Sequence, residues 1–178
     1  MLVPRQPAPG LALPTLGHGQ FDLGRETSTW GTLLVFYRGL HCPICAGYLT
    51  ELERLVPEFE KRGVGVVAVS SDAQDRARGM ADKVKASNLR FAHDLALSTA
   101  QEWGLMISTS RGKTSIGIEE PKLFSEPGLF LVRADGTVYF GNVQTMPFMR
   151  PHFKELPAAL DFVQGNDYPA RGEYTGPV

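Results

Sequence analysis

The sequence predicts a single α/β domain in three layers, with a mixed central β-sheet flanked by helices. Three observations support this. The chain has 178 residues, which suits one hydrophobic core and is short for two. Strand-like and helix-like segments alternate along it. A tight-turn signal, Ala134-Asp135-Gly136, adds an antiparallel strand pair. We expect the core over residues 9–163 and an irregular C-terminal tail over residues 164–178.

The first elements surround the two cysteines of the chain. Residues 4–14 are rich in proline and predict an extended lead-in. Residues 32–37 form a continuous apolar run, as expected for a strand covered on both faces. Apolar residues then recur every three or four positions up to Phe59, which predicts an amphipathic helix that begins at Cys42 or Pro43.

The next segments continue the alternation. Pro57 removes a backbone donor from the first helix, so we expect a kink or break near Val56 before Gly63 ends the helix. Residues 64–70 predict a second buried strand, and residues 73–86 predict a second helix. We expect Asp72 to cap that second helix.

The second half predicts the sheet edges and the last helix. Residues 89–93 predict a short strand, and a brief helix follows as far as Trp103. Residues 129–133 and 137–142 predict the two strands of the hairpin. A closing helix follows Arg150-Pro151, with a start that Pro157 delays.

Charge and hydropathy exclude two classes of partner. Eighteen Lys and Arg residues against 19 Asp and Glu residues give a net charge of −1. A nearly neutral chain offers no basic field for nucleic acid or for an anionic membrane surface. At the N-terminus Pro4 follows only two apolar residues after Met1, so the apolar region of a secretory signal is not expected there. The apolar runs of the chain are shorter than the roughly 20 residues that span a bilayer. We therefore expect a soluble cytoplasmic protein.

The two cysteines stand in one Cys42-Pro43-Ile44-Cys45 motif at the predicted helix start. This spacing suits a disulfide within one helical turn. Cys45 continues the apolar row of the helix, so we expect it to face the core, and Cys42 to lie exposed at the mouth of the site. This arrangement makes Cys42 the nucleophile and Cys45 the resolving thiol. A reducing cytoplasm favours a catalytic pair over a structural disulfide.

A thiolate at a helix N-terminus is stabilised by free backbone N–H groups and by the helix dipole. Arg38 and His41 are candidates for further stabilisation of the Cys42 thiolate. Lowering a thiol pKa from about 8.5 to about 7 requires roughly 2 kcal/mol. Two alternatives are inert core cysteines and a zinc site, although the histidines outside the motif lack zinc-ligand spacing. We expect no metal and no cofactor.

Four further motifs follow one another along the chain. In order, they are Phe36-Tyr37, the helix end Phe59-Glu60-Lys61-Arg62-Gly63-Val64, the strand Val67-Ala68-Val69-Ser70-Ser71-Asp72, and Gly128-Leu129-Phe130-Leu131-Val132 with Asp135-Gly136. With these motifs the chain resembles the thioredoxin-like fold, and more closely its peroxiredoxin-like (AhpC/TSA) branch. The resemblance runs from about residue 9 to residue 162. It implies a thioredoxin-like three-layer fold and thiol redox chemistry.

The resemblance also implies roles for single residues. Peroxiredoxins carry F-Y-P-x-x-x-T-x-x-C, and in this register Cys45 matches the peroxidatic cysteine, while Arg38 replaces the proline and Cys42 replaces the threonine. Pro127 stands where the family has an arginine, and it resembles the cis-proline that faces the cysteines of thioredoxins. Arg150 resembles a second family arginine near the site, with a surface charge as the alternative.

The primary functional prediction is a thiol-disulfide oxidoreductase in which Cys42 attacks a disulfide and Cys45 resolves the mixed disulfide. The first alternative is a thiol peroxidase, and the second is a non-catalytic redox sensor or binding module. The expected partners are an external thiol reductant of thioredoxin or glutathione type, a disulfide or peroxide substrate, and a second copy in a homodimer. Residues 106–126 are either a binding loop or a tolerated insertion.

Overall fold

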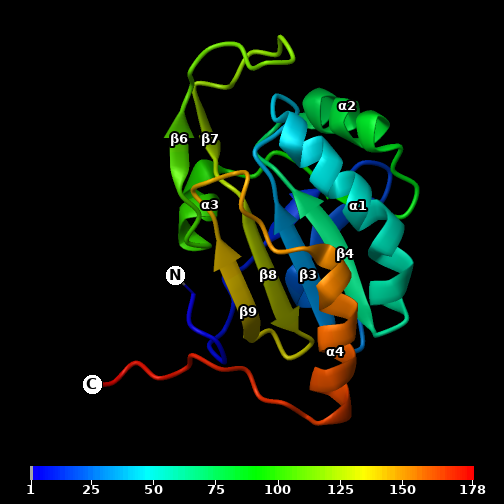
Figure 1. Cartoon of the computed structure of the whole chain (residues 1–178), viewed down its shortest axis with the longest axis vertical. Coiled ribbons are helices and arrows are strands. Elements are labelled where there is room, and N and C mark those ends of the chain that lie inside the picture. Colours follow the sequence, from blue (N-terminus) through cyan, green and yellow to red (C-terminus); the bar gives the residue numbers. More distant parts are fainter. Residues whose placement is uncertain (1) are drawn as a thin grey trace.

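A five-stranded mixed sheet forms the centre of the computed structural model, which describes residues 2–178 (Figure 1). The strand order is β5-β4-β3-β8-β9. Strand β3 pairs in parallel with β4 and antiparallel with β8, so the predicted mixed sheet is confirmed. The strands are β3 (Gly31–Phe36), β4 (Val64–Val69), β5 (Arg90–Ala92), β8 (Gly128–Arg133) and β9 (Val138–Val143).

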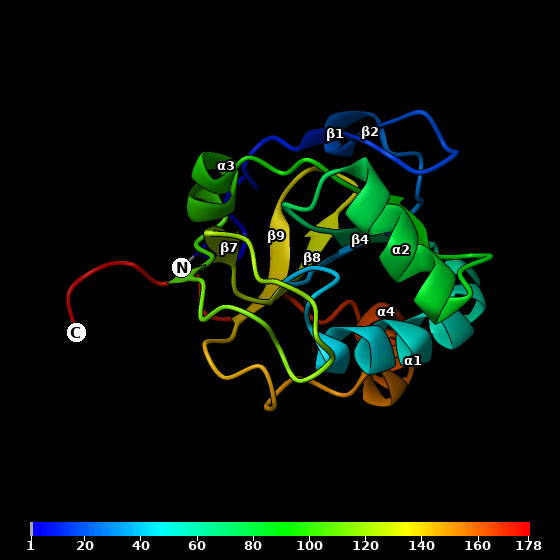
Figure 2. The same cartoon turned by 90° about the horizontal axis from the view of Figure 1, so that it is seen from above.

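Both faces of the sheet are covered, which makes the three predicted layers (Figure 2). One face carries α1 (Pro43–Glu60), α2 (Gln74–Val84) and α4 (Leu156–Gly165). The other face carries α3 (Leu97–Glu102) and a small hairpin of β1 (Ala12–Pro14) and β2 (Gln20–Asp22). Among the described residues, none of these helices combines the length and apolar character needed to cross a membrane.

Strand β3 is buried along its whole length because successive side chains enter opposite cores. Leu33 and Val35 pack with the α1 side, whereas Leu34 and Phe36 pack with the α3 side. The Phe36 ring lies 5.5 Å from that of Trp103. A continuous apolar run is therefore what this central strand requires.

Helix α1 begins at Pro43, as predicted, and buries one stripe of side chains against the sheet: Cys45, Leu49, Leu52, Glu53, Val56 and Phe59. The predicted break near Val56 is wrong, because the helix continues through Pro57 to Glu60. Pro57 lies in the last turn, where its missing N–H removes a single helical hydrogen bond. Helix α4 begins next to Pro157, which occupies its first turn as predicted.

Two short hairpins escaped the sequence prediction. The β1–β2 pair lies partly within the proline-rich lead-in, and β6 (Ile107–Thr109) pairs with β7 (Leu123–Ser125) inside residues 106–126. Each of these strands has only three residues, too few to show an alternating pattern. The β6–β7 hairpin extends beyond the central sheet at the end where α1 begins (Figure 1).

Glu53 ties α1 to the loop before β5. Its carboxylate accepts hydrogen bonds from the backbone N–H groups of Ser87, Asn88 and Leu89, at 3.0, 3.0 and 2.8 Å, and from the Ser87 hydroxyl at 2.8 Å. Burial alone would raise the pKa of Glu53, but these donors outweigh it and lower the pKa below its ordinary value. The ionised side chain thus stabilises the folded state.

We predict that Glu53→Gln lowers the free energy of unfolding by about 1.5–3 kcal/mol at pH 7, the range for hydrogen bonds to a charged group. Because folding lowers the pKa of Glu53, its contribution is present above the unfolded pKa of about 4.3 and is lost as the pH falls through the folded pKa. The difference between wild type and variant in urea unfolding should therefore shrink from pH 7 to pH 3. Glu60→Gln, an exposed change on the same helix, should cost little at either pH.

Candidate active site

The cysteine pair lies where α1 begins, beyond the carboxyl end of β3. Cys42 is the N-cap residue and Pro43 occupies the first turn, as predicted. The Cys42 Sγ accepts the backbone N–H of Cys45 at 3.3 Å, and the two sulfur atoms are 2.6 Å apart with the Cys45 thiol donating. Both thiols are free. Because they are in contact within one helical turn, they can form an intramolecular disulfide.

The predicted exposure of Cys42 is wrong. Cys42 is only 2% exposed and Cys45 is fully buried, whereas Pro43 between them is exposed. Cys42 is covered because the segment before α4 passes the N-terminal end of α1. This segment places the Arg150 side chain against both sulfurs. Both sulfurs are therefore covered by protein, with the Arg150 guanidinium against them.

Arg150 is part of the site and not a surface charge. Its Nη2 lies 3.3 Å from the Cys45 Sγ and 3.9 Å from the Cys42 Sγ. Its Nε donates to the Pro147 carbonyl at 2.8 Å, and its guanidinium stands 5.1 Å from the centre of the Tyr48 ring. The Tyr48 hydroxyl donates to the Pro151 carbonyl at 2.7 Å, so Tyr48 holds the backbone next to Arg150.

The two thiols differ in their electrostatic surroundings. The hydrogen bond from the Cys45 thiol, followed by the Cys45 N–H and the charges of Arg150 and Arg38, lowers the pKa of Cys42 to about 6 despite its burial. Burial raises the pKa of Cys45, and the neighbouring Cys42 raises it further. The two shifts have opposite directions, so the surroundings favour the thiolate form of Cys42 and the thiol form of Cys45.

Arg38 lies upstream of the pair but is held by the β6–β7 hairpin. Its Nη2 is 3.4 Å from the Glu120 carboxylate, and its Nε is 3.4 Å from the Glu126 carboxylate. The guanidinium also stands 4.6 Å from the centre of the Phe124 ring. Two buried carboxylates offset one positive charge, so Arg38 adds less to the thiolate than its sequence position suggests.

His41 does not contribute a positive charge to the site. The side chain is fully buried, and its ring centre lies 4.7 Å from that of Phe124. Burial, reinforced by the charge of Arg38, lowers the pKa of His41 to about 4, so the imidazole is neutral at pH 7. The expected charge stabilisation of Cys42 by His41 is therefore wrong.

Asp72 is a site-supporting residue that the sequence interpretation missed. The residue preceding α2 in the cap position is Ala73, without a side-chain hydrogen bond, so the predicted cap by Asp72 is wrong. Asp72 instead accepts the Leu40 N–H at 2.7 Å and the Arg76 Nε at 3.0 Å. It thus fixes the backbone two residues before Cys42. The sequence signal for a role of Asp72 in the site was its position shortly after a buried parallel strand.

Pro127 differs from the proline expected by resemblance to thioredoxins. Residues 2–178 contain no cis peptide bond, so the expected cis bond is wrong. Pro127 is buried, and its carbonyl accepts the Gln144 N–H at 3.0 Å. That carbonyl is therefore already paired within the fold.

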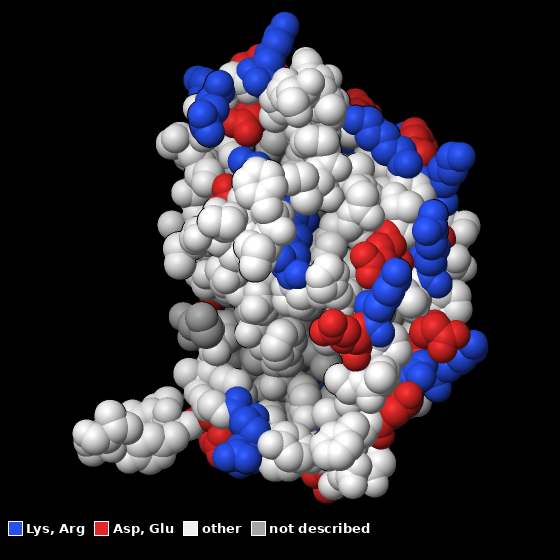
Figure 3. Space-filling model, in the orientation of Figure 1, with Lys and Arg blue, Asp and Glu red and all other residues white. Residues whose placement is uncertain are grey.

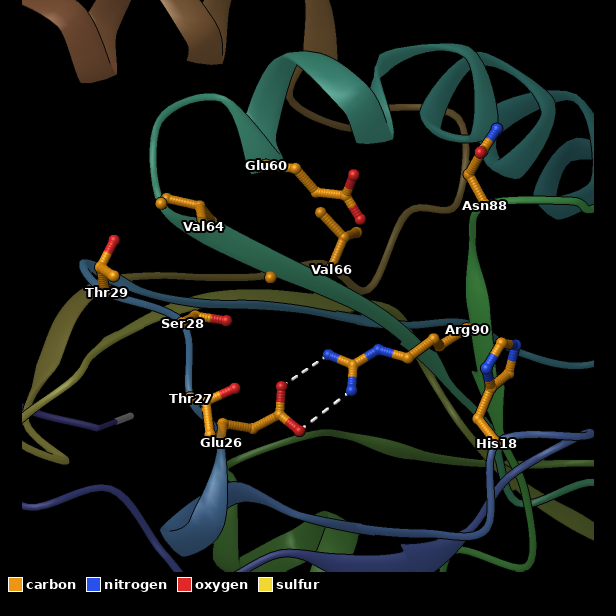
Figure 4. Close-up of a pocket in the computed structure, with 12 residues that line it drawn as sticks. His18, Glu26, Thr27, Ser28, Thr29, Glu60, Val64, Val66, Asn88 and Arg90 are labelled. Atoms are coloured by element: carbon orange, nitrogen blue, oxygen red, sulfur yellow. Dashed lines mark hydrogen bonds and ion pairs between the residues drawn. The ribbon is translucent and has the colours of Figure 1, made fainter.

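A polar pocket lies far from the two thiols. It has a volume of about 530 Å³ and is lined by Glu60 at the end of α1, by the start of β4 and by Arg90 (Figure 4). Arg90 binds the Glu26 carboxylate through two contacts of 3.0 and 2.6 Å. The pocket lies at the opposite end of α1 from Cys42 and takes no part in the thiol chemistry.

Comparisons with known proteins agree with this fold. The model of the AhpC/TSA family matches residues 4–140. Among solved structures, Peroxiredoxin 6 of Arenicola marina is similar, with a TM-score of 0.76, 16% identity, and coverage of 94% of this chain and 76% of that chain. No curated protein sequence matches the chain significantly.

Two proteins of Mycobacterium tuberculosis have similar structures. For AhpC the TM-score is 0.73 at 15% identity, with 96% of this chain and 97% of that chain covered. For Peroxidoxin BcpB the TM-score is 0.70 at 18% identity, with 92% of this chain and 99% of that chain covered. At these identities the structures show the thioredoxin-like fold of peroxiredoxins, and the family model covers most of the sequence. The chain therefore belongs to the AhpC/TSA family and is an oxidoreductase that acts on peroxides or disulfides.

Proposed function

We propose that this chain is a thiol-dependent peroxidase that reduces hydroperoxides with the Cys42–Cys45 pair. The observation that carries the proposal is the burial of both sulfurs beneath Arg150. A hydroperoxide presents a narrow O–O group that fits such a site, whereas the disulfide of a folded protein is wide and needs an exposed nucleophile. The family supports chemistry on peroxides or disulfides, and this burial favours the peroxide.

The proposed first step is attack of the Cys42 thiolate on the distal oxygen of the hydroperoxide. The S–O bond forms as the O–O bond breaks, which leaves a sulfenic acid on Cys42 and an alkoxide or hydroxide that takes a proton. The Arg150 guanidinium stands 3.9 Å from the Cys42 Sγ, where its charge can stabilise the departing oxygen.

Cys45 completes the proposed cycle. Its sulfur attacks the sulfenic acid on Cys42, the S–S bond forms and water leaves. Two equivalents of an external thiol then return the pair to the reduced form and leave as a disulfide. The direct contact of the two sulfurs supports this resolution without a large rearrangement.

The disulfide oxidoreductase predicted first from the sequence is the less favoured candidate. Cys42 is buried and Pro127 has no cis bond, and both findings weaken that candidate. A cytoplasmic location, with its abundant thiol reductants, suits the peroxidase cycle. A homodimer stays a prediction, to be checked by the molecular mass in solution.

The ionisation of Cys42 is testable in the Cys45→Ser variant, which has one thiol and keeps a hydroxyl donor at position 45. We predict half-maximal thiolate absorbance near pH 6, because the Cys42 environment lowers its pKa to about 6. Adding Arg150→Gln should raise the pKa of Cys42 by about 1, since it removes a nearby positive charge. Arg54→Gln, an exposed change on the same helix, should leave the titration unchanged. Half-ionisation above pH 8 in the Cys45→Ser variant would contradict the assignment.

Rapid-mixing kinetics with hydrogen peroxide tests the order of the two cysteines. We predict that Cys45→Ser is oxidised quickly and stops at a trappable sulfenic acid, whereas Cys42→Ser reacts about 100-fold more slowly at pH 7. The reason is that a thiol with a pKa of 9 or more is at most about 1% ionised at pH 7, and burial raises the pKa of Cys45. The reverse pattern would assign the first step to Cys45. Rapid reaction of the wild type with a protein disulfide but not with peroxide would refute the peroxidase.

A further inference from the structure

A pocket of about 200 Å³ opens beside the cysteine pair, between the first turns of α1 and the segment before α4. Six of its lining residues matter here: Ile44, Tyr48, Glu51, Phe148, Arg150 and His152. Ile44 stands between the two cysteines in the motif, and Arg150 contacts both sulfurs. The pocket therefore adjoins the redox centre through Arg150, with neither cysteine in its lining, and the proposed peroxidase cycle assigns it no ligand.

The pocket carries two opposite charges with unused hydrogen-bonding capacity. Within residues 2–178, the Oε1 atom of Glu51 and the Nη1 atom of Arg150 are both buried without a hydrogen-bond partner. Enclosed polar atoms in this state cost free energy unless a partner is bound. An ammonium group would satisfy Glu51, and a carboxylate would satisfy Arg150.

Apolar surface lies between these charges. Ile44, the Tyr48 ring and the Phe148 ring line the pocket, and the Phe148 side chain is 72% exposed. On the face that Figure 3 shows, uncharged surface borders a Lys or Arg side chain near the middle of the molecule. Such walls suit a short chain of methylene groups and a thiol. A ligand with both charges on a small apolar frame thus matches the pocket.

We propose that this pocket binds a zwitterionic low-molecular-weight thiol, the direct reductant of the Cys42–Cys45 disulfide. Its ammonium group lies at Glu51, its carboxylate at Arg150, and its sulfur toward the pair. The ligand belongs to the class of thiol-bearing amino acids and small peptides. The proposal rests on the proposed function only in requiring that the Cys42–Cys45 disulfide forms.

The redox state controls when Arg150 is available to the reductant. In the reduced pair Arg150 faces the Cys42 thiolate, with Nη2 at 3.9 Å from its sulfur. A disulfide carries no charge, so oxidation removes this anion and leaves the guanidinium to a carboxylate. We therefore expect Arg150 to bind a carboxylate more strongly when the pair is oxidised, which is when the reductant is needed.

The proposed reduction balances as thiol-disulfide exchange. The ligand thiolate attacks one sulfur of the Cys42–Cys45 bond, forms a mixed disulfide and releases the other cysteine as a thiolate that takes a proton. A second thiolate attacks the mixed disulfide and leaves with the first as a small disulfide. Two small thiols are oxidised and one protein disulfide is reduced.

The experiment separates the pocket from the peroxidase activity. The protein is oxidised with diamide, which forms the disulfide without peroxide, and its reduction is followed with four small thiols. Cysteine carries both charged groups, cysteamine only the ammonium, 3-mercaptopropionate only the carboxylate, and 2-mercaptoethanol neither. Rates are compared at equal thiolate concentration. We expect cysteine to be the most efficient.

The Glu51→Gln variant provides the decisive comparison. We expect it to lower the efficiency about tenfold with cysteine and cysteamine, and to leave 3-mercaptopropionate and 2-mercaptoethanol unchanged, because only the first two carry an ammonium group. Glu60→Gln removes the same charge from the far end of α1 and should change none of the four rates.

Equal effects of Glu51→Gln on all four thiols, or none on any, would overturn the pocket proposal. Wild-type rates that do not depend on the charged groups of the thiol would also overturn the pocket proposal. Failure to turn over peroxide, with the ammonium-selective pattern intact, would instead refute the peroxidase and leave the pocket standing.

Discussion

The Cys42 sulfur is the acceptor on which the site depends. It caps the helix by accepting the Cys45 N–H, and it also accepts the Cys45 thiol. These two donors and the Arg150 charge stabilise its negative form, so the N-terminus of α1 and the Cys45 thiol share one acceptor. A helix that began one residue later would lose the cap and the contact between the sulfurs together. The start of α1 at Pro43 is therefore a chemical requirement as well as a structural one.

The two arginines near the pair have different roles because their surroundings differ. Arg150 faces the sulfurs, with Tyr48 holding the adjoining backbone. Arg38 is bound by Glu120 and Glu126, which offset its charge and connect the loop before Cys42 to the β6–β7 hairpin. Asp72, which follows β4, binds the same loop through the Leu40 N–H. The loop before Cys42 is therefore held both by the β6–β7 hairpin and by Asp72. Residues 106–126 thus contact the loop before Cys42 through Glu120 and Glu126.

Much of the fold could be predicted because its long elements carry periodic patterns. The buried run of β3 and the apolar row of α1 follow directly from side-chain alternation and helical spacing. The hairpins β1–β2 and β6–β7 could not be predicted, because each of their short strands pairs only with the other and neither joins the central sheet. The break predicted at Pro57 is absent, since a proline in the last turn of a helix removes only one helical hydrogen bond.

By itself, the sequence determined the chemistry: two cysteines one helical turn apart at a proline-started helix, with Arg150 as a candidate partner. Only the tertiary structure decided how that chemistry is used. It buried Cys42, brought Arg150 over both sulfurs from 105 residues away, left His41 uncharged and placed Asp72 under the loop before Cys42. The physical reason is that burial and long-range contacts set both access and pKa, and neither is encoded in local spacing.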